Sequence, residues 1–124
     1  MTATVSAPSA ISISLTPTNV SCNSANGGNN SNGSISLSPT GGTGSYTYSW
    51  APGGSTSANL TGKAPGTYTV TVTDGNGCTK TSSTTISQPT AITVSTTVTN
   101  VSCNSTNNGS ITATATGGTG TLSY

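Results

Sequence analysis

Three observations predict an all-β fold, an Ig-like antiparallel β-sandwich in tandem copies of about 80 residues. Apolar or aromatic side chains alternate with polar ones in runs such as Tyr46–Trp50 and Tyr68–Val72, which places every second side chain on one face of a strand. Glycine-rich turns such as Gly41–Gly44 and Asp74–Gly77 bracket these runs. Segments of the chain also recur later in the same order, so the fold itself is expected to repeat.

The first copy contains enough strands for a complete sandwich. The segments that alternate are 11–15, 34–38, 46–50, 57–60, 67–73 and 78–86. We expect the first strand to break at Pro17 and to resume at Val20–Cys22. Asp-Gly and Asn-Gly in Asp74–Gly77 favour the positive φ angles of hairpin turns. Seven or so short strands at this spacing favour two packed sheets of the Ig type, and no segment has the 3.6-residue period of a helix.

The inward-facing positions of these strands form the predicted core. It is thin, because the chain has no Phe and only 17 Val, Ile and Leu residues. Trp50 is expected to be the buried tryptophan of the third strand, and the context of Tyr68 resembles a tyrosine corner. The other predicted core residues lie on the inward faces of their strands: Ile13, Ile35, Leu37, Val70 and Val72.

The composition excludes several classes of function. Charged residues make up 2% of the chain and the net charge is +1, so no electrostatic field attracts nucleic acid. The chain has no His and a single acidic residue, so no nucleophile–base pair can form; we expect neither an enzyme nor a cofactor. No secretory signal and no apolar stretch of membrane-spanning length is visible, and membrane insertion is not expected.

Parts of the sequence recur in order. Asn19–Ser24 reappears as Asn100–Ser105, 81 positions later, and Gly41–Gly44 reappears as Gly117–Gly120, 76 positions later. Two further matched pairs are Val5–Ile11 with Ile86–Ile92 and Asn32–Ile35 with Asn108–Ile111. The change of offset indicates a shorter loop in the second copy, and the recurrence predicts a tandem array.

These matches divide the chain into four parts. Residues 1–8 are expected to be the tail of a preceding repeat or a linker, residues 9–87 a complete Ig-like repeat (copy one), residues 88–90 a linker, and residues 91–124 the N-terminal part of a second repeat (copy two). Pro89 stiffens the linker because its ring fixes φ.

The cysteines predict a disulfide bond. Cys22 follows the first strand and Cys78 begins the last one, and in a sandwich those points can be neighbours, so we predict a Cys22–Cys78 disulfide; the alternative is two free thiols. Cys103 is the counterpart of Cys22, and its own partner is expected beyond Tyr124. Three Cys with no His and one Asp do not make a usual zinc site.

Two other groups of residues have a structural and a ligand-binding interpretation. Tyr46, Tyr48 and Trp50 share one strand face; we expect them to pack in the core, and the alternative is an exposed stripe that stacks on surface polysaccharide. Asp74 and Asn76 are expected to form a plain turn. The alternative is a weak calcium site at best, because calcium usually needs several carboxylates.

Several motifs resemble the SprB repeat, the Ig-like repeat of giant cell-surface adhesins in gliding and related Bacteroidota. The motifs are NVSCN, NGSI, GGTGSYTYSW, APGTYTVTVTD and ISQPTAI, and the resemblance covers copy one and what is present of copy two. It implies an extracellular, cell-surface protein built of many repeats and exported by a type IX secretion system.

We therefore expect a non-enzymatic repeat module that acts as a stalk or spacer in adhesion or gliding. The alternative is a subunit of an extracellular fibre in which identical chains complete one another by β-strand addition. Carbohydrate binding is a third hypothesis, and it requires Trp50 to be exposed.

Overall fold

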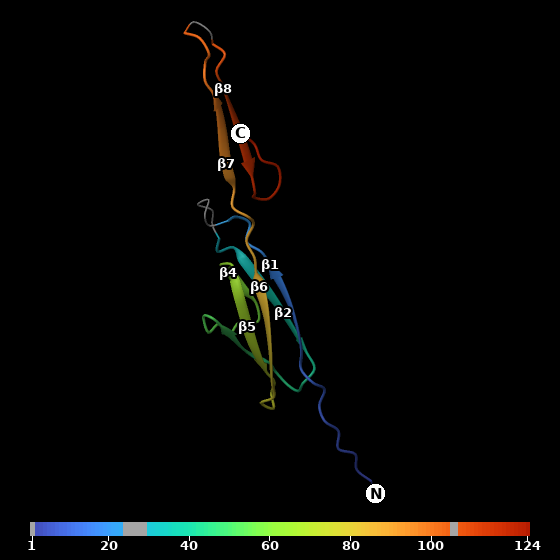
Figure 1. Cartoon of the computed structure of the whole chain (residues 1–124). Coiled ribbons are helices and arrows are strands. Elements are labelled where there is room, and N and C mark those ends of the chain that lie inside the picture. Colours follow the sequence, from blue (N-terminus) through green and yellow to red (C-terminus); the bar gives the residue numbers. More distant parts are fainter. Residues whose placement is uncertain (1, 24–29, 105–106) are drawn as a thin grey trace.

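The chain folds into eight β-strands in a computed structural model that describes residues 2–23, 30–104 and 107–124 (Figure 1). The strands are β1 Ser12–Thr18, β2 Gly33–Thr40, β3 Thr47–Ala51, β4 Leu60–Lys63, β5 Gly66–Thr73, β6 Thr79–Ile86, β7 Thr93–Thr99 and β8 Ser110–Thr116. The described part of the chain contains no helix long and apolar enough to cross a bilayer.

Copy one is a sandwich of two three-stranded antiparallel sheets. One sheet has the order β1-β2-β4 and the other has the order β3-β5-β6. β1 also lies against β6, which closes one side of the sandwich. This is the Ig strand arrangement with one strand fewer than the seven of a constant-type domain. The all-β sandwich prediction is confirmed, with six strands in copy one rather than seven or so.

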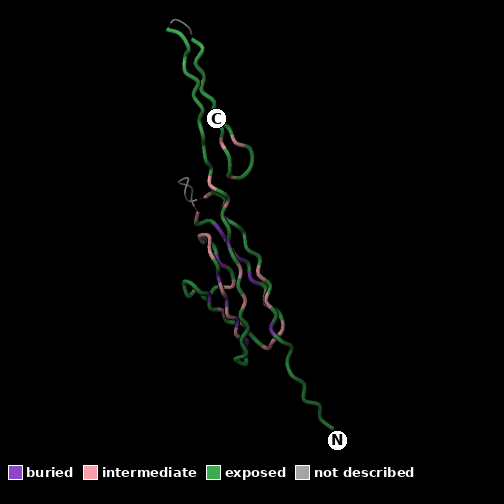
Figure 2. Tube along the Cα trace, viewed as in Figure 1, coloured by how far each residue is buried: buried purple, intermediate pink, exposed green. Residues whose placement is uncertain are grey.

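The two sheets of copy one enclose a single apolar core. Its buried members are Ile11, Val20, Ile35, Leu37, Trp50, Leu60, Tyr68, Val70, Val72 and Ile86. In Figure 2 the buried positions all lie in this part of the chain. Ile13 packs against the core but is only half-buried, because β1 is the edge strand of its sheet. Four core residues were not in the predicted set: Ile11, Val20, Leu60 and Ile86.

The predicted break of the first strand at Pro17 is wrong. β1 continues through Pro17, which lies opposite Ile35 of β2. A proline is tolerated there because β1 is an edge strand, where the missing N–H can face away from the sheet. The expected continuation at Val20–Cys22 is not a strand. Instead, the N–H of Val20 donates a hydrogen bond of 3.1 Å to the carbonyl of Ser87.

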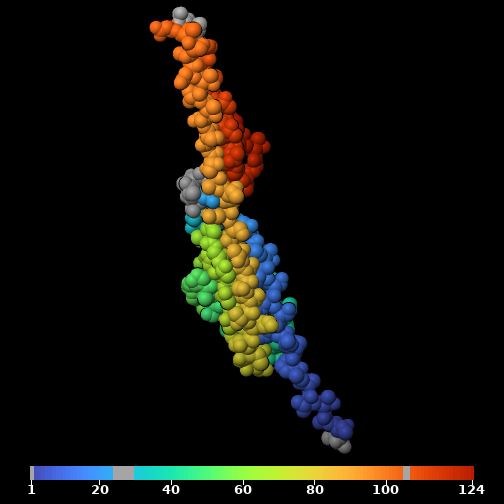
Figure 3. Space-filling model, viewed as in Figure 1, coloured from blue at the N-terminus to red at the C-terminus, as the bar shows by residue number. Residues whose placement is uncertain are grey.

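Copy two consists of the antiparallel β7–β8 hairpin and the turn after it. Its register repeats that of β1–β2: Thr93 lies opposite Thr116 as Ser12 lies opposite Thr40. The hairpin continues beyond copy one in an elongated molecule (Figure 3). No second sheet covers it among the described residues, and Ile111 is 73% exposed whereas its counterpart Ile35 is 0% exposed.

Candidate functional site

The linker after β6 is held by the NVSCN motif of copy one. The N–H of Val20 donates to the Ser87 carbonyl at 3.1 Å, and the N–H of Ser87 donates to Oδ1 of Asn19 at 2.9 Å. Nδ2 of Asn23 donates to the carbonyl oxygen of Pro89 at 2.7 Å. The two asparagines therefore fix the direction in which the chain leaves copy one.

In both copies the serine of this motif bonds to the asparagine of the Asn-Gly-Ser-Ile segment. Oδ1 of Asn32 accepts a hydrogen bond from the N–H of Ser21 at 3.2 Å, and its Nδ2 donates to the Ser21 hydroxyl at 2.6 Å. Asn108 makes the corresponding bonds to Ser102 at 3.1 and 2.7 Å. The end of the β7–β8 hairpin thus shares these two hydrogen bonds with the end of copy one that lies against the linker.

At the base of each copy, a Gly-Gly-Thr-Gly turn binds the chain that enters the first strand. Gly42 N–H donates to the Ser9 carbonyl at 2.7 Å, and in copy two Gly118 N–H donates to Thr90 at 2.9 Å. Gly41 has a φ of 78°, and a Cβ at this position would collide with the carbonyl oxygen of Ala10. The turn therefore needs glycine both for its conformation and for this close approach.

The Asp74 carboxylate connects the Gly41–Gly44 turn at the base of copy one to its own turn, Asp74–Gly77. The residue is 6% exposed. Its Oδ2 accepts from the N–H of Thr43 at 3.1 Å, and its Oδ1 accepts from the N–H groups of Asn76 and Cys78 at 3.0 and 2.9 Å. Burial raises the pKa of Asp74, but the hydrogen bonds from Cys78, Thr43 and Asn76 outweigh it and place the pKa below its ordinary value.

This geometry gives Asp74 a structural task, and the weak calcium site stays a hypothesis. Both of its carboxylate oxygens face backbone N–H groups, whereas calcium would need them as ligands together with further oxygens. Within the described ranges, no three His, Cys, Asp or Glu side chains are grouped so that they could hold a metal ion. The turn at Asp74–Gly77 is an organised connection between β5 and β6.

The linker of each copy borders a hollow. The junction hollow, about 280 Å³, lies between the copies and is lined by Ser21, Cys22, Asn23, Pro89, Thr90, Ile92, Gly118 and Thr119. The base hollow, about 240 Å³, lies at the lower end of copy one and is lined by Pro8, Ser9, Ala10, Ile11, Asp74, Cys78, Thr79 and Lys80. Each hollow contains one cysteine beside a Pro-Ser/Thr-Ala-Ile segment.

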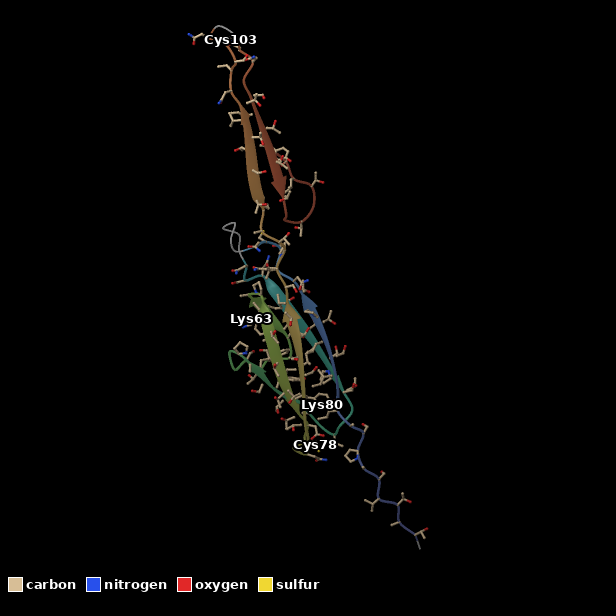
Figure 4. All side chains as sticks on the ribbon, viewed as in Figure 1. Lys63, Cys78, Lys80 and Cys103 are labelled. Carbon is tan, nitrogen blue, oxygen red and sulfur yellow. The ribbon has the colours of Figure 1, made fainter. Side chains whose placement is uncertain are left out.

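The predicted Cys22–Cys78 disulfide is wrong. Both residues are exposed free thiols, and they lie near opposite ends of β1, since Cys78 shares a hollow with Ile11 whereas Cys22 follows the end of the strand. β1 has seven residues, which span roughly 20 Å, whereas the Cα atoms of a disulfide lie within about 7 Å. In Figure 4, Cys78 lies at the lower end of copy one and Cys103 at the far end of the hairpin.

The aromatic residues in and just before β3 do not form an exposed stripe. Trp50 is 1% exposed, and its Nε1 donates to the Ser57 carbonyl at 2.9 Å. Tyr46 and Tyr48 are half-buried against the core, and the hydroxyl of Tyr46 donates to the carbonyl of Gly41. The hypothesis of a sugar-stacking platform that includes Trp50 is therefore wrong.

Tyr68 lies in the core at 8% exposure. Its hydroxyl donates to the carbonyl of Ala64, four residues earlier, at 2.9 Å. This backward bond near the start of β5 is the geometry of a tyrosine corner. The residue fixes the connection between the sheets.

Sequence reasoning did not assign roles to Asn19, Asn23 and the Ser9–Ala10 carbonyls. A signal for them was present, because all lie in the segments that recur in order along the chain. These recurring segments are the ones that meet at the ends of the copies. The recurrence identifies the junction, but the donors and acceptors are visible only in the folded chain.

The comparisons with known proteins agree with this organisation. The family model of the SprB repeat matches residues 14–55 and 95–124, together more than half of the chain. The two matched segments begin 81 positions apart, which is the offset between Asn19–Ser24 and Asn100–Ser105. No curated protein and no solved structure matches the chain.

Proposed function

The chain belongs to the SprB repeat family, and from this premise we propose that it is a stalk segment of an extracellular adhesin. The family consists of structural repeats associated with cell-surface proteins, so the chain is a repeat module of an adhesin-like protein. The finer proposal is mechanical: the repeats hold a distant adhesive part away from the cell at a fixed reach.

The observation that carries this proposal is the hydrogen bond from Asn23 to Pro89. It joins the upper end of copy one to the linker at 2.7 Å. The bonds that Val20 and Asn19 make with Ser87 lie two residues earlier in the chain. The chain from Ser87 to Pro89 is bonded in three places and contains a proline, so it has little freedom to bend. Consecutive repeats then extend end to end.

The surface of copy one also suits a spacer. The solvent-facing positions of β5 and β6 are mainly Thr and Ser, and the whole chain has two cations and one anion. Thr67 and Thr85 pair across these strands through their hydroxyls at 3.2 Å. Cross-strand Thr pairs stabilise a sheet without exposing apolar area.

The test uses an extended chain, in which Tyr124 is followed by a second instance of residues 49–87. This completes copy two in register because Tyr124 is the counterpart of Tyr48. Small-angle X-ray scattering of the reduced protein should give a narrow distribution of maximum dimension. Asn23→Ala should broaden that distribution, whereas Asn76→Ala, an exposed turn residue at the other end of copy one, should leave it unchanged. An unaltered extended chain that scatters as two freely jointed beads contradicts the proposal.

A second candidate function is a fibre in which identical chains cover one another's hairpins. The exposed apolar residues of copy two favour it: Ile92, Val94, Val98, Val101 and Ile111 are 40 to 73% exposed. Sedimentation velocity of the 124-residue chain at several concentrations separates the two functions. A stalk segment stays monomeric, whereas a fibre subunit forms species that grow with concentration.

A further inference from the structure

The two free thiols of copy one, Cys22 and Cys78, lie at its two ends. Cys22 borders the junction hollow, where it lies beside Pro89, Thr90 and Ile92. It is exposed and lies two residues after Val20, whose N–H donates to the Ser87 carbonyl just before the linker. Its surroundings therefore belong partly to copy one and partly to the base of the next copy.

Cys78 occupies the corresponding place at the base of copy one. It borders the base hollow together with Pro8, Ser9 and Ile11. These three residues are the counterparts, 81 positions earlier, of the Pro89, Thr90 and Ile92 that Cys22 faces. Each cysteine thus lies against the same three positions of a segment that enters a first strand. Cys78 faces the segment that enters its own copy, whereas Cys22 faces the segment that enters the next copy.

The geometry at the base is the same in both copies. Gly42 bonds to Ser9 at 2.7 Å and Gly118 bonds to Thr90 at 2.9 Å. Gly41 and Gly117 both have positive φ, at 78° and 90°. A Cβ on Gly41 would meet the carbonyl oxygen of Ala10, and a Cβ on Gly117 would meet that of Ala91. The environment of Cys78 can therefore be transferred to the base of copy two.

The hydrogen bonds of Asp74 also indicate where the copy-two counterpart of Cys78 would lie. The Asp74 carboxylate bridges the N–H of Thr43 and the N–H of Cys78 at 3.1 and 2.9 Å. The counterpart of Thr43 in copy two is Thr119, which lines the junction hollow together with Cys22. A copy-two turn equivalent to Asp74–Cys78 would dock on Thr119 and bring its cysteine to the hollow that Cys22 borders.

We propose that a disulfide joins consecutive repeats: Cys22 of one repeat bonds to the Cys78 counterpart of the repeat that follows. By the same rule, Cys78 bonds to the Cys22 counterpart of the repeat before it, and Cys103 bonds forward as Cys22 does. Each repeat is then linked covalently at both ends, and the array resists extension at its junctions.

Bond formation needs an oxidant, which we take to be a small-molecule or protein disulfide. In two exchange steps the oxidant accepts two electrons and two protons from the two cysteine thiols. One S–S bond forms across the junction, and the oxidant's own S–S bond is reduced to two thiols. An extracellular location provides oxidising conditions in which such a bond persists.

The test uses the extended chain with Cys78→Ser and Cys103→Ser, which leaves Cys22 and the added cysteine. After treatment with oxidised glutathione we expect a monomer lighter by two hydrogens, with Cys22 joined to the added cysteine by peptide mapping. Both thiols should lose their reactivity toward iodoacetamide. Thiols that stay reactive in a folded chain, as judged by circular dichroism, overturn the proposal, and so do covalent dimers in place of the monomeric disulfide.

A matched variant carries Cys22→Ser and Cys78→Ser and retains Cys103 with the added cysteine, the pair that a bond within one repeat would join. It should form no monomeric disulfide under the same conditions, and its forming one as readily as the first variant overturns the proposal. The inference rests on the end-to-end stalk, but the two fail separately: scattering on the reduced protein tests the stiff junction, and thiol mapping tests the bond.

Discussion

The Asp74 carboxylate accepts a hydrogen bond of 3.1 Å from the N–H of Thr43, 31 residues earlier in the chain. The other oxygen of the same carboxylate accepts from Asn76 and Cys78. One buried acidic side chain thereby organises two glycine-rich turns, one between β2 and β3 and one between β5 and β6. Asp74 is the single acidic residue of the chain, and it accepts hydrogen bonds from three backbone N–H groups at the base of copy one.

Replacement of Asp74 by Asn is expected to lower the melting temperature by several degrees. An amide keeps one acceptor oxygen for Asn76 and Cys78, but its NH₂ group would face the N–H of Thr43, donor against donor. Differential scanning calorimetry at neutral pH measures the change. Asn76→Asp, which alters an exposed side chain in the same turn, is the control, and equal melting temperatures for Asp74→Asn and the unaltered protein would contradict the assignment.

The pH dependence of stability in acid should report Asp74 alone. Its folded-state pKa lies below the ordinary value because of the three backbone donors, so the unfolded state binds the proton first as the pH falls. Stability is therefore fully present above the unfolded-state pKa of about 4 and is lost as the pH drops through the folded-state pKa. The chain has no His and no other acidic side chain. Urea unfolding between pH 2 and 7 should show this loss, and Asp74→Asn should abolish it.

Trp50 should fluoresce as a fully buried indole. At 1% exposure its emission should be blue-shifted and resist quenching by acrylamide, and soluble polysaccharides should not change it. Trp50→Phe removes the donor to the Ser57 carbonyl and should lower the free energy of unfolding by about 1–3 kcal/mol. Tyr124→Phe, at a residue that is 89% exposed, is the control. Efficient quenching in the folded protein would mean that the indole is accessible.

Gly41→Ala should destabilise copy one more than Gly54→Ala. Both glycines have positive φ, at 78° and 61°, so both substitutions should incur the roughly 1–2 kcal/mol cost of a left-handed non-glycine residue. Only the Cβ at Gly41 collides with a neighbour, the carbonyl of Ala10, whereas nothing lies within 4 Å of a Cβ at Gly54. Chemical denaturation compares the two variants, and equal losses would show that the close approach to Ala10 is unimportant.

Ile35 and Ile111 occupy the same position in the two copies but should respond differently to truncation. Ile35→Ala removes a side chain that is 0% exposed and should cost about 2–5 kcal/mol. Ile111→Ala alters a side chain that is 73% exposed and should change stability by at most about 0.5 kcal/mol. In the extended chain, where a second sheet covers the hairpin, the two costs should converge. A large effect of Ile111→Ala in the 124-residue chain would instead indicate a covering partner chain.

The strands were predictable because their signal is local. Alternation of apolar and polar residues around Val70 and Val72 needs only the pleat of a single strand, and glycine-rich segments such as Gly41–Gly44 mark where strands end. The prediction failed at Pro17, since whether a proline breaks a strand depends on whether that strand lies at the edge of a sheet. Strand order depends on which strands pair with one another, and the sequence of one strand does not show it.

The sequence by itself determined the strands, the tandem copies and the core position of Trp50, because each follows from short-range periodicity or direct recurrence. Only the tertiary structure decided where the cysteines lie relative to one another. The sequence predicts a bond between Cys22 and Cys78, but in the folded chain the two thiols lie near opposite ends of β1. Cys22 lies against Pro89–Ile92, where the chain enters copy two, and Cys78 lies against Pro8–Ile11, where the chain enters copy one. Proximity across a junction comes from the stacking of folded units, which no single repeat encodes.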